Sequence, residues 1–403
     1  MRILILGAGF AGLWAAIGAA RKLDEMGMKA AADILIVDRN PYHNIRVRNY
    51  EADLSDAAIP LSEVLDPIGV AHVAAEVEAI DTTNQEVAIA TADSRQRLSY
   101  DRLVLALGSE LVRPPIPGLA AHGFDVDTYA AAVRLDAHLA KLATLAASPA
   151  CSTVVIVGAG FTGIEVATEL PNRLAQAGIT HPRIILVDPS PVVGATIGDE
   201  ARPVINEALA ALHIETRLGV MVTAVHADGI ILSSEEFIPS MTVMWCGGMA
   251  ANPLTAEIAS QHDRHGRLVV DQFMRATGLK NVFAAGDIAS CAIDGTHSTV
   301  MSCQFARPMG RFAGHNVVAD LFGQPMLRLN IDWYVTVLDL GGWGALYTVG
   351  WDRRVQSTGA AAKATKNVIN RQRIYPPRTA SRADILAAAA PTIQAPPGVR
   401  SKS

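Results

Sequence analysis

Two copies of one glycine-rich motif are the features of this sequence best suited to chemistry. The first copy spans residues 7–12 and follows the apolar run 3–6, and the second spans residues 158–163 and follows the apolar run 154–157. In a strand–glycine–helix unit, the first glycine permits the turn, the second lets the backbone approach a pyrophosphate, and the third lets the helix pack closely. The helix N-terminus then offers free N–H groups to phosphates. The sequence therefore predicts two dinucleotide sites.

An acidic residue at the end of a second apolar strand completes each motif. Asp38 follows residues 34–37, and Asp188 follows residues 184–187. Such a carboxylate can accept hydrogen bonds from a ribose hydroxyl. One glycine motif alone is weak evidence, because glycine bends between a strand and a helix are common. Here strand, glycines, helix and acid occur together twice, which favours two binding sites over two ordinary bends.

The elements that position these motifs are predicted to form parallel α/β domains. A strand that is apolar at every residue needs cover on both faces, as in a parallel sheet. The chain has 403 residues, of which 50% are hydrophobic and 18% charged, so it has room for two or three domains with large cores. Its formal net charge of −5 argues against binding to nucleic acid, because that role needs a basic face.

Several other features limit the class of protein. The chain enters its first strand at residue 3, so no signal peptide is expected and a cytoplasmic location is predicted. Residues 333–351 are long enough to span a membrane, but Asp339 and a glycine pair favour two strands joined by a glycine turn. The four cysteines show no close pairing, and His43, His138, His297 and His315 have no metal-like spacing, which predicts neither a disulfide framework nor a metal site.

The C-terminal part of the chain carries a basic segment and then a tail. Basic residues outnumber acids between residues 353 and 373, which predicts a solvated surface; contact with a membrane surface or an anionic partner is the alternative. Pro, Ala, Ser and Arg dominate afterwards, so residues 379–403 are predicted to be an extended or disordered tail. The basic residues of the segment are Arg353, Arg354, Lys363, Lys366, Arg371 and Arg373.

Four motifs in a fixed order resemble those of a known superfamily. Besides the two glycine motifs, residues 101–109 end a strand at Gly-Ser, and residues 281–287 read Asn-Val-Phe-Ala-Ala-Gly-Asp. This order resembles the two-dinucleotide flavoproteins of the pyridine-nucleotide:disulfide oxidoreductase superfamily. Within it, the chain is most similar to the type II NADH dehydrogenase group, through residues 160–165 and 243–248.

The resemblance implies an α/β fold with two Rossmann-type dinucleotide-binding domains. FAD would bind a discontinuous domain of residues 1–110 and 281–325, and NADH, rather than NADPH, would bind an inserted domain of residues 111–280. A small C-terminal α+β region of residues 326–378 would follow. Residues implied at the FAD site are Gly7, Gly9, Phe10, Ala11, Gly12, Asp38, Arg39, Gly108, Gly286 and Asp287. Residues implied at the NADH site are Gly158, Gly160, Phe161, Thr162, Gly163, Asp188 and Gly247.

Three further residues are candidates for the catalytic region. The resemblance implies that Glu165 lies near the nicotinamide and flavin rings; a first-turn acid that stabilises its helix is the alternative. Residues 303–308 match the quinone motif Ala-Gln-x-Ala-x-Gln only at Gln304 and Ala306. Gln304 can donate a hydrogen bond to a carbonyl. Cys303 could act as a redox group beside the flavin, but a buried inert thiol is the favoured interpretation.

Cysteines are missing from two places where related enzymes carry them. Residues 40–54 lack the pair of disulfide reductases, and residues 162–168 lack the cysteine of sulfide:quinone reductases. The resemblance thus implies an enzyme that passes hydride from NADH to FAD and electrons to a quinone or similar small acceptor. A reductase of a protein electron carrier such as a ferredoxin, docking on the basic segment, and a non-turnover redox-sensing flavoprotein are the alternatives. Peripheral contact with a membrane and a homodimer are left open.

Asp188 predicts a preference for NADH over NADPH. Its carboxylate would accept a hydrogen bond from the ribose 2′-hydroxyl, whereas NADPH brings a negative phosphate to the same position. Losing the contact and adding repulsion is expected to cost about 1–3 kcal/mol, which lowers kcat/KM for NADPH by roughly 5- to 150-fold. Steady-state assays with both nucleotides measure this ratio. Equal kcat/KM values would show that a nearby arginine, Arg183 or Arg202, sets the choice instead.

Overall fold

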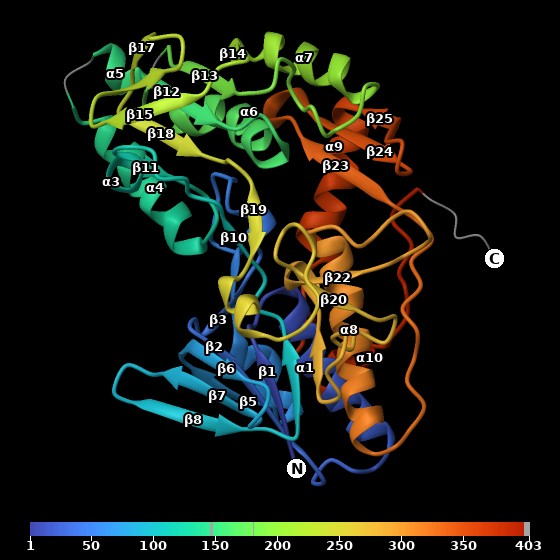
Figure 1. Cartoon of the computed structure of the whole chain (residues 1–403). Coiled ribbons are helices and arrows are strands. Elements are labelled where there is room, and N and C mark those ends of the chain that lie inside the picture. Colours follow the sequence, from blue (N-terminus) through green and yellow to red (C-terminus); the bar gives the residue numbers. More distant parts are fainter. Residues whose placement is uncertain (146–147, 180, 399–403) are drawn as a thin grey trace.

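The first domain is built on a parallel sheet whose central strands are buried on both faces. The computed structural model describes residues 1–145, 148–179 and 181–398 (Figure 1). The sheet has the order β21-β9-β1-β2-β5, and all neighbouring strands are parallel. The strands span Val282–Ala284 (β21), Arg102–Leu105 (β9), Arg2–Leu6 (β1), Asp33–Asp38 (β2) and Ala71–Ala74 (β5). The apolar run after Arg2 is fully buried, as its composition predicts.

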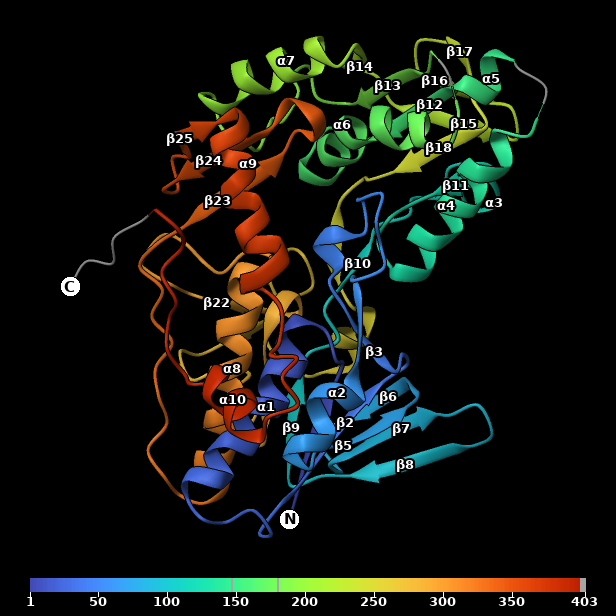
Figure 2. The ribbon, with the colours of Figure 1, turned by 180° about the vertical axis from the view of Figure 1, so that it is seen from behind.

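Helices cover one face of this sheet and a small antiparallel sheet covers the other (Figures 1 and 2). The helices are α1, Phe10–Glu25, and α8, Cys303–Leu321. The antiparallel sheet consists of β6, Glu76–Asp81, β7, Glu86–Ala90, and β8, Arg95–Ser99, and its apolar side chains join the same core. Shorter elements are β3 (Tyr42–Asn44), η1 (Arg46–Arg48), β4 (Ala58–Pro60), α2 (Leu61–Leu65) and η2 (Asp66–Ile68).

The second domain repeats the same plan. Its parallel sheet has the order β11-β18-β12-β13-β14. These strands span Gly123–Phe124 (β11), Thr242–Trp245 (β18), Thr153–Val157 (β12), Arg183–Asp188 (β13) and Ile214–Leu218 (β14). Its helices are Leu119–His122 (α3), Tyr129–Leu142 (α4), Pro149–Ser152 (α5), Phe161–Gln176 (α6) and Ala201–Ala211 (α7). An antiparallel sheet of β15 (Val222–His226), β16 (Gly229–Leu232) and β17 (Phe237–Pro239) packs beside it.

Two paired strands connect the domains. The chain leaves the first domain through β10, Ser109–Leu111, and returns through β19, Met249–Ala251, which pairs antiparallel with it. Apolar residues after β19, from Ile258 to Ala276, belong to the core of the first domain. The inserted domain therefore ends near residue 248, whereas the sequence placed its end at residue 280. The returning segment contains η3 (Pro253–Glu257), β20 (Leu268–Val270), η4 (Gly286–Ile288) and β22 (Ala289–Cys291).

The C-terminal region is a three-stranded antiparallel sheet followed by helices. The strands are β23, Val335–Asp339, β24, Ala345–Val349, and β25, Arg354–Thr358, with the turn η5, Gly341–Trp343, after β23. Residues 333–351 thus form the predicted hairpin, and none of the helices in the described ranges is long and apolar enough to cross a membrane.

The end of the chain differs from the predicted tail. After α9, Gly359–Val368, and the π-helical turn η6, Ile369–Arg373, the chain forms α10, Arg382–Ala388. Ile385 and Leu386 of α10 are buried in the first core, so residues 382–388 are ordered by apolar burial that the alanine-rich composition concealed. Residues 399–403 lie outside the described residues.

Helices α1 and α8 run parallel and nearly touch along their backbones. A Cβ atom on Gly310 would overlap the carbonyl oxygen of Ala11, and one on Gly314 would overlap that of Ala15. Small residues on both helices are what permits this approach. Because the two helices are parallel, their N-terminal ends lie on the same side of the domain.

The close approach predicts that Gly314→Ala destabilises the first domain. A methyl group at this position has to push α8 away from α1, and such overpacking costs about 1–3 kcal/mol. Thermal unfolding of the FAD-loaded protein measures the loss. Gly295→Ala is the matched control, since a Cβ there meets no atom within 4 Å. The same midpoint in both variants would contradict the packing argument.

Candidate functional site

The first glycine motif forms a turn that brings backbone N–H groups to an open surface. The N–H of Gly7 donates to the carbonyl oxygen of Val37 (2.7 Å), which joins the turn to the neighbouring strand. A Cβ on Gly12 would overlap the carbonyl oxygen of Gly7, so only glycine fits there. A Cβ on Gly9, by contrast, would meet no atom within 4 Å. Gly9 therefore leaves free the place where a pyrophosphate approaches the start of α1, which Phe10 and Ala11 begin.

The second motif has the same construction in the inserted domain. The N–H of Gly158 donates to the carbonyl oxygen of Val187 (2.8 Å). A Cβ on Gly163 would overlap the carbonyl oxygen of Gly158, and a Cβ on Gly160 would again meet no atom within 4 Å. Phe161, Thr162 and Gly163 form the first turn of α6. Two cradles of one design, each beginning a buried helix, fit two dinucleotides.

The two acidic residues close these turns. Asp38 accepts hydrogen bonds from the N–H groups of Ala8 (2.7 Å) and Asn40 (2.8 Å). Asp188 accepts them from Ala159 (2.6 Å) and Ser190 (2.7 Å) in the same way. Each carboxylate oxygen can accept more than one hydrogen bond, so both acids are held in place with capacity left for a ribose hydroxyl.

The two arginines that could favour NADPH are engaged elsewhere. Arg183 forms a two-point ion pair with Glu215 (2.7 and 2.8 Å), and Arg202 pairs with Asp199 (2.9 Å). Arg39, expected at the FAD site, is largely exposed and lies 3.6 Å from Glu76.

Asp287 lies at the carboxyl end of the first sheet, after β21. The hydroxyl of Ser109 donates to its carboxylate (2.7 Å), and Arg46 lies 3.8 Å away. Burial raises the pKa of Asp287, although Arg46 and Ser109 act in the opposite direction. Arg46 also donates to Ser109 (3.0 Å) and pairs with Asp127 of the inserted domain, so it joins both domains at this point. The sequence reasoning missed Arg46, because nothing local marks it as part of the site.

Gly108 and Gly286 lie beside Asp287, at the ends of neighbouring strands. Both have positive φ angles, +74° and +80°, which glycine adopts without strain. A Cβ on Gly286 would lie 2.7 Å from the Cβ of Ala11, so glycine lets the start of α1 approach this edge. Gly247, expected at the NADH site, follows Cys246, whose carbonyl oxygen lies 2.7 Å from a Cβ built on Gly158.

Glu165 forms a buried ion pair with the C-terminal region. Its carboxylate accepts from the ammonium group of Lys366 (2.6 Å) and from the N–H of Asp339 (3.0 Å). Burial raises the pKa of Glu165, while Lys366 opposes the shift. Asp339 in turn accepts from the hydroxyl of Tyr50 (3.0 Å) and from Lys363 (2.5 Å). Glu165 thus connects the first turns of α6 to β23 and α9.

The basic segment is only partly the solvated surface that was predicted, since Arg354 and Arg371 are exposed but Lys366 is buried. Lys366 is buried beside Glu165, and Arg371 pairs with Glu51 (3.0 Å). Arg373 donates to the carbonyl oxygen of Ala395 (2.7 Å). The physical reason is that these cations meet acids and carbonyl groups from distant parts of the chain, which the local sequence does not reveal.

Arg353 links the second glycine motif to the region of α8. Its guanidinium lies 5.5 Å from the ring centroid of Phe161 and 5.4 Å from that of Tyr334. It donates to the Tyr334 hydroxyl (3.1 Å), and its Nη1 atom is buried without a hydrogen-bond partner. Tyr334 stacks on Trp351 (4.3 Å between centroids), near Phe305 of α8.

The start of α8 presents buried polar atoms without partners. The Ser302 hydroxyl makes no capping bond, and Oγ of Ser302 and Nε2 of Gln304 are buried with no hydrogen-bond partner. The free N–H groups of the first helical turn lie at the same place. Cys303 packs with the apolar residues Ile45 and Ile374, and burial raises the pKa of its thiol. A protonated thiol in apolar surroundings fits the interpretation of an inert residue.

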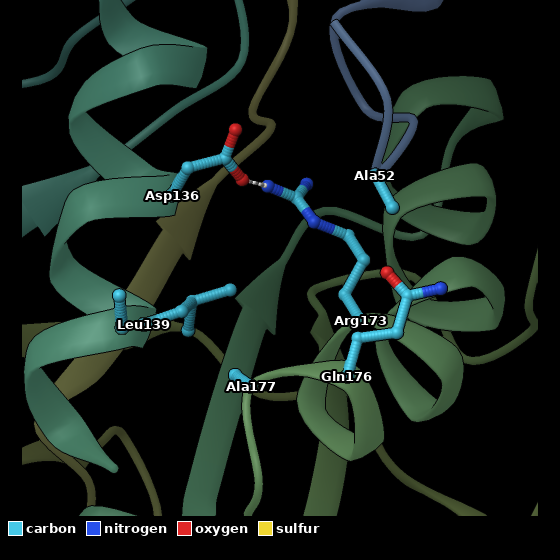
Figure 3. Close-up of a pocket in the computed structure, with 7 residues that line it drawn as sticks. Ala52, Asp136, Leu139, Arg173, Gln176 and Ala177 are labelled. Atoms are coloured by element: carbon cyan, nitrogen blue, oxygen red, sulfur yellow. Dashed lines mark hydrogen bonds and ion pairs between the residues drawn. The ribbon is translucent and has the colours of Figure 1, made fainter. Parts of the chain in front are cut away.

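Two cavities accompany these residues. The smaller, of about 100 Å³, lies between α4 and α6 and is lined by residues including Ala52, Asp136 and Arg173. Asp136 and Arg173 form the ion pair drawn in Figure 3. Arg173 also donates to the carbonyl oxygen of Tyr50 (3.0 Å), so this contact fastens the first domain to α6. The larger, of about 560 Å³, is lined by residues including Arg267, Thr299 and Met301, directly before α8.

Comparisons with known proteins identify the family. Residues 1–310 match the family model described as pyridine nucleotide-disulphide oxidoreductase. The chain belongs to this family. It is 55% identical to an NADH dehydrogenase-like protein of Mycobacterium tuberculosis over 98% of this chain and 100% of that protein. It is 29% identical to a demethylphylloquinone reductase of Synechocystis over 86% of each chain.

A solved structure supports the same fold. NDH2 from Plasmodium falciparum in complex with NADH superposes with a TM-score of 0.76 at 14% identity, covering 96% of this chain and 97% of that one. The protein is accordingly an FAD- and NAD(P)H-dependent oxidoreductase with the predicted Rossmann-type domains. No cluster of His, Cys, Asp or Glu that could hold a metal ion occurs in the described ranges.

The ion pair between Glu165 and Lys366 predicts strong coupling between their substitutions. Lys366→Met leaves a buried carboxylate unpaired and is expected to cost about 3–5 kcal/mol of folding free energy. Adding Glu165→Gln removes the unpaired charge and should restore part of the loss. Thermal unfolding of both single variants and the double variant measures the coupling.

Lys363→Met is the matched control for this experiment. Lys363 lies on the same helix, but its side chain is 30% exposed, against 8% for Lys366. We expect a smaller loss for it. Additive effects of Lys366→Met and Glu165→Gln would contradict the coupling.

Proposed function

We propose that this protein oxidises NADH and reduces a quinone, with FAD as the carrier between them. Two nucleotide cradles of one design support two dinucleotides in one chain, and the family membership supports FAD and NADH as these two. The relatives named an NADH dehydrogenase-like protein and a demethylphylloquinone reductase support a quinone as the acceptor. The observation that carries the proposal is the unpartnered Nε2 of Gln304 at the start of α8.

We assign the first cradle and Asp287 to FAD. When bound, FAD supplies the group that accepts a hydride and releases electrons. The N–H groups of Phe10 and Ala11 at the start of α1 would bind its pyrophosphate, and Asp38 would accept from its adenosine ribose. Asp287 would accept from a ribityl hydroxyl rather than face a phosphate, since two anions repel each other.

The second cradle would hold NADH and orient its nicotinamide. Gly160 and Thr162 would approach the pyrophosphate through their backbone, and Asp188 would select the unphosphorylated ribose. Glu165, fixed by Lys366, would keep the first turns of α6 rigid near the reacting rings. A nucleotide held in one orientation reacts faster, because its rotational freedom is lost before the transfer and not during it.

The start of α8 would serve the acceptor. Reduction of a quinone places negative charge on its carbonyl oxygens, and a donor that waits unpaired in a buried place can stabilise that charge. Nε2 of Gln304 and the free N–H groups of α8 are such donors. Pro308 replaces the second glutamine of the quinone motif, so Gln304 is the one glutamine of the motif left to bind a quinone carbonyl.

The alternative of a protein electron carrier is less well supported. It required the basic segment as a docking face, but Lys366, Arg371 and Arg373 are engaged with other residues of the chain.

Steady-state NADH oxidation with menadione, a ferredoxin and oxygen in parallel tests the proposal. Turnover with menadione well above that with the other two supports it. Turnover with the ferredoxin alone would favour the carrier reductase, and none with any acceptor would favour a redox sensor. Membrane contact and dimer formation stay predictions.

Gln304→Ala is expected to slow the second half-reaction selectively. Reoxidation of the reduced enzyme by menadione should fall by roughly 10-fold, the effect of losing one hydrogen bond of about 1.4 kcal/mol. Reduction by NADH should stay nearly unchanged. Anaerobic stopped flow separates the two steps, and Gln324→Ala, an exposed glutamine beyond α8, is the control. Equal slowing of both steps would mean that Gln304 supports FAD itself.

A further inference from the structure

Helix α8 carries two arginines that have no counter-charge. Arg311 is 5% exposed and Arg307, one turn earlier, is partly buried. Within the described ranges, neither guanidinium forms an ion pair or hydrogen bond, and the Nε atom of each is buried without a partner. Nearby arginines behave differently: Arg102 and Arg275 both pair with Asp320 at the end of the same helix (2.6 and 2.5 Å). The absence of a partner is thus a property of these two positions.

The contact that both arginines do make is with one aromatic ring. The guanidinium of Arg307 lies 4.9 Å from the ring centroid of Trp14, and that of Arg311 lies 4.4 Å from it. An indole face attracts a cation, but two cations on one ring also repel each other. The indole offsets only part of what burial of two unpaired charges costs.

The surroundings of the two guanidiniums are positive or neutral. Burial lowers the pKa of Arg311 to about 10, and burial together with Arg311 lowers that of Arg307 to about 9. Arg373 adds a third positive charge near Arg307. His43 is uncharged at neutral pH, because burial lowers its pKa to about 4. The site is short of negative charge.

We propose that Arg307 and Arg311 form a binding site for a phosphate group on the Trp14 face of α8. A guanidinium offers a planar fork of donors that fits two oxygens of an anion. Two forks one helical turn apart suit a phosphate, whose several oxygens can accept from both. The Trp14 ring contacts both guanidiniums and helps to fix their position.

This site is distinct from the cradle assigned to the FAD pyrophosphate. The carbonyl oxygen of Arg311 lies 2.9 Å from a Cβ built on Gly18 of α1, so the backbone of Arg311 packs against the second half of this helix. Both guanidiniums lie on the ring of Trp14, four residues after Phe10, where the cradle begins, which is about 6 Å along the helix axis. The two places are thus about one helical turn apart, and a phosphate bound at Arg311 would come from another molecule: a free phosphate compound or the headgroup of a phospholipid.

Calorimetric titration of inorganic phosphate into the full-length, FAD-loaded protein tests the proposal. We expect saturable binding of one phosphate per chain in sodium chloride buffer, and at least a 10-fold weaker affinity in Arg311→Met and in Arg307→Met. Arg275→Met is the matched control, because it removes a neighbouring arginine that already has a partner, and it should bind phosphate like the wild type. FAD absorbance and thermal unfolding verify that each variant is folded, and Arg311→Lys, which keeps the charge without the fork, replaces any variant that is not.

A second measurement separates the two sources of phosphate. Cosedimentation with phosphatidylglycerol vesicles, but not with phosphatidylcholine vesicles, that is lost in Arg311→Met assigns the site to a lipid headgroup. Saturable phosphate binding without vesicle binding assigns it to a free phosphate compound. Wild-type protein that binds neither, or binding that Arg307→Met and Arg311→Met leave unchanged, overturns the proposal.

Discussion

The backbone contact between α1 and α8 is the constraint on which the arrangement of the site depends. Gly310 and Gly314 of α8 lie against the carbonyl oxygens of Ala11 and Ala15, so the helices are close and parallel. Their N-terminal ends, with the free N–H groups of both, are therefore on one side of the domain. One end belongs to a phosphate cradle and the other to the proposed acceptor site. The proposed FAD would extend from the phosphate cradle to the acceptor site, so these two sites have to lie close together. The two helices that form them are almost 300 residues apart in sequence.

The same cradle occurs twice, but its surroundings differ. In the first domain, the residue behind the turn is Ala106, and α1 is covered by α8. In the second domain, the corresponding residue is Cys246, and α6 is covered by the C-terminal hairpin and α9 through Glu165 and Lys366. Each cradle is thus closed by a late part of the chain. The covering element gives each site its own chemistry, since the glycine turn itself supplies only backbone groups.

Much of this organisation could be predicted from the sequence because it is local. The apolar strands, the glycine turns and the terminal acids Asp38 and Asp188 occupy short windows whose residue types have few structural solutions. Lys366 could not be assigned to Glu165, because the two are 201 residues apart and a lysine on a helix is usually solvated. Arg46 was missed for the same reason. Helix α10 was missed because its alanine-rich composition is typical of a tail. Only the fold shows that Ile385 and Leu386 pack into the core of the first domain.

The strand pair β10 and β19 has a consequence for how the chain is made. The pair is a hairpin in which a complete domain takes the place of the turn. During synthesis, residues 112–248 emerge before the edge strand β21 and the covering helix α8 exist, so the first domain is still open on one side. The inserted domain has its whole sheet by then and can fold first, as domains of nascent chains generally do. The domain that begins the chain is therefore completed after the sheet of the inserted domain, because α8 and α10, which cover its core, come later in the chain.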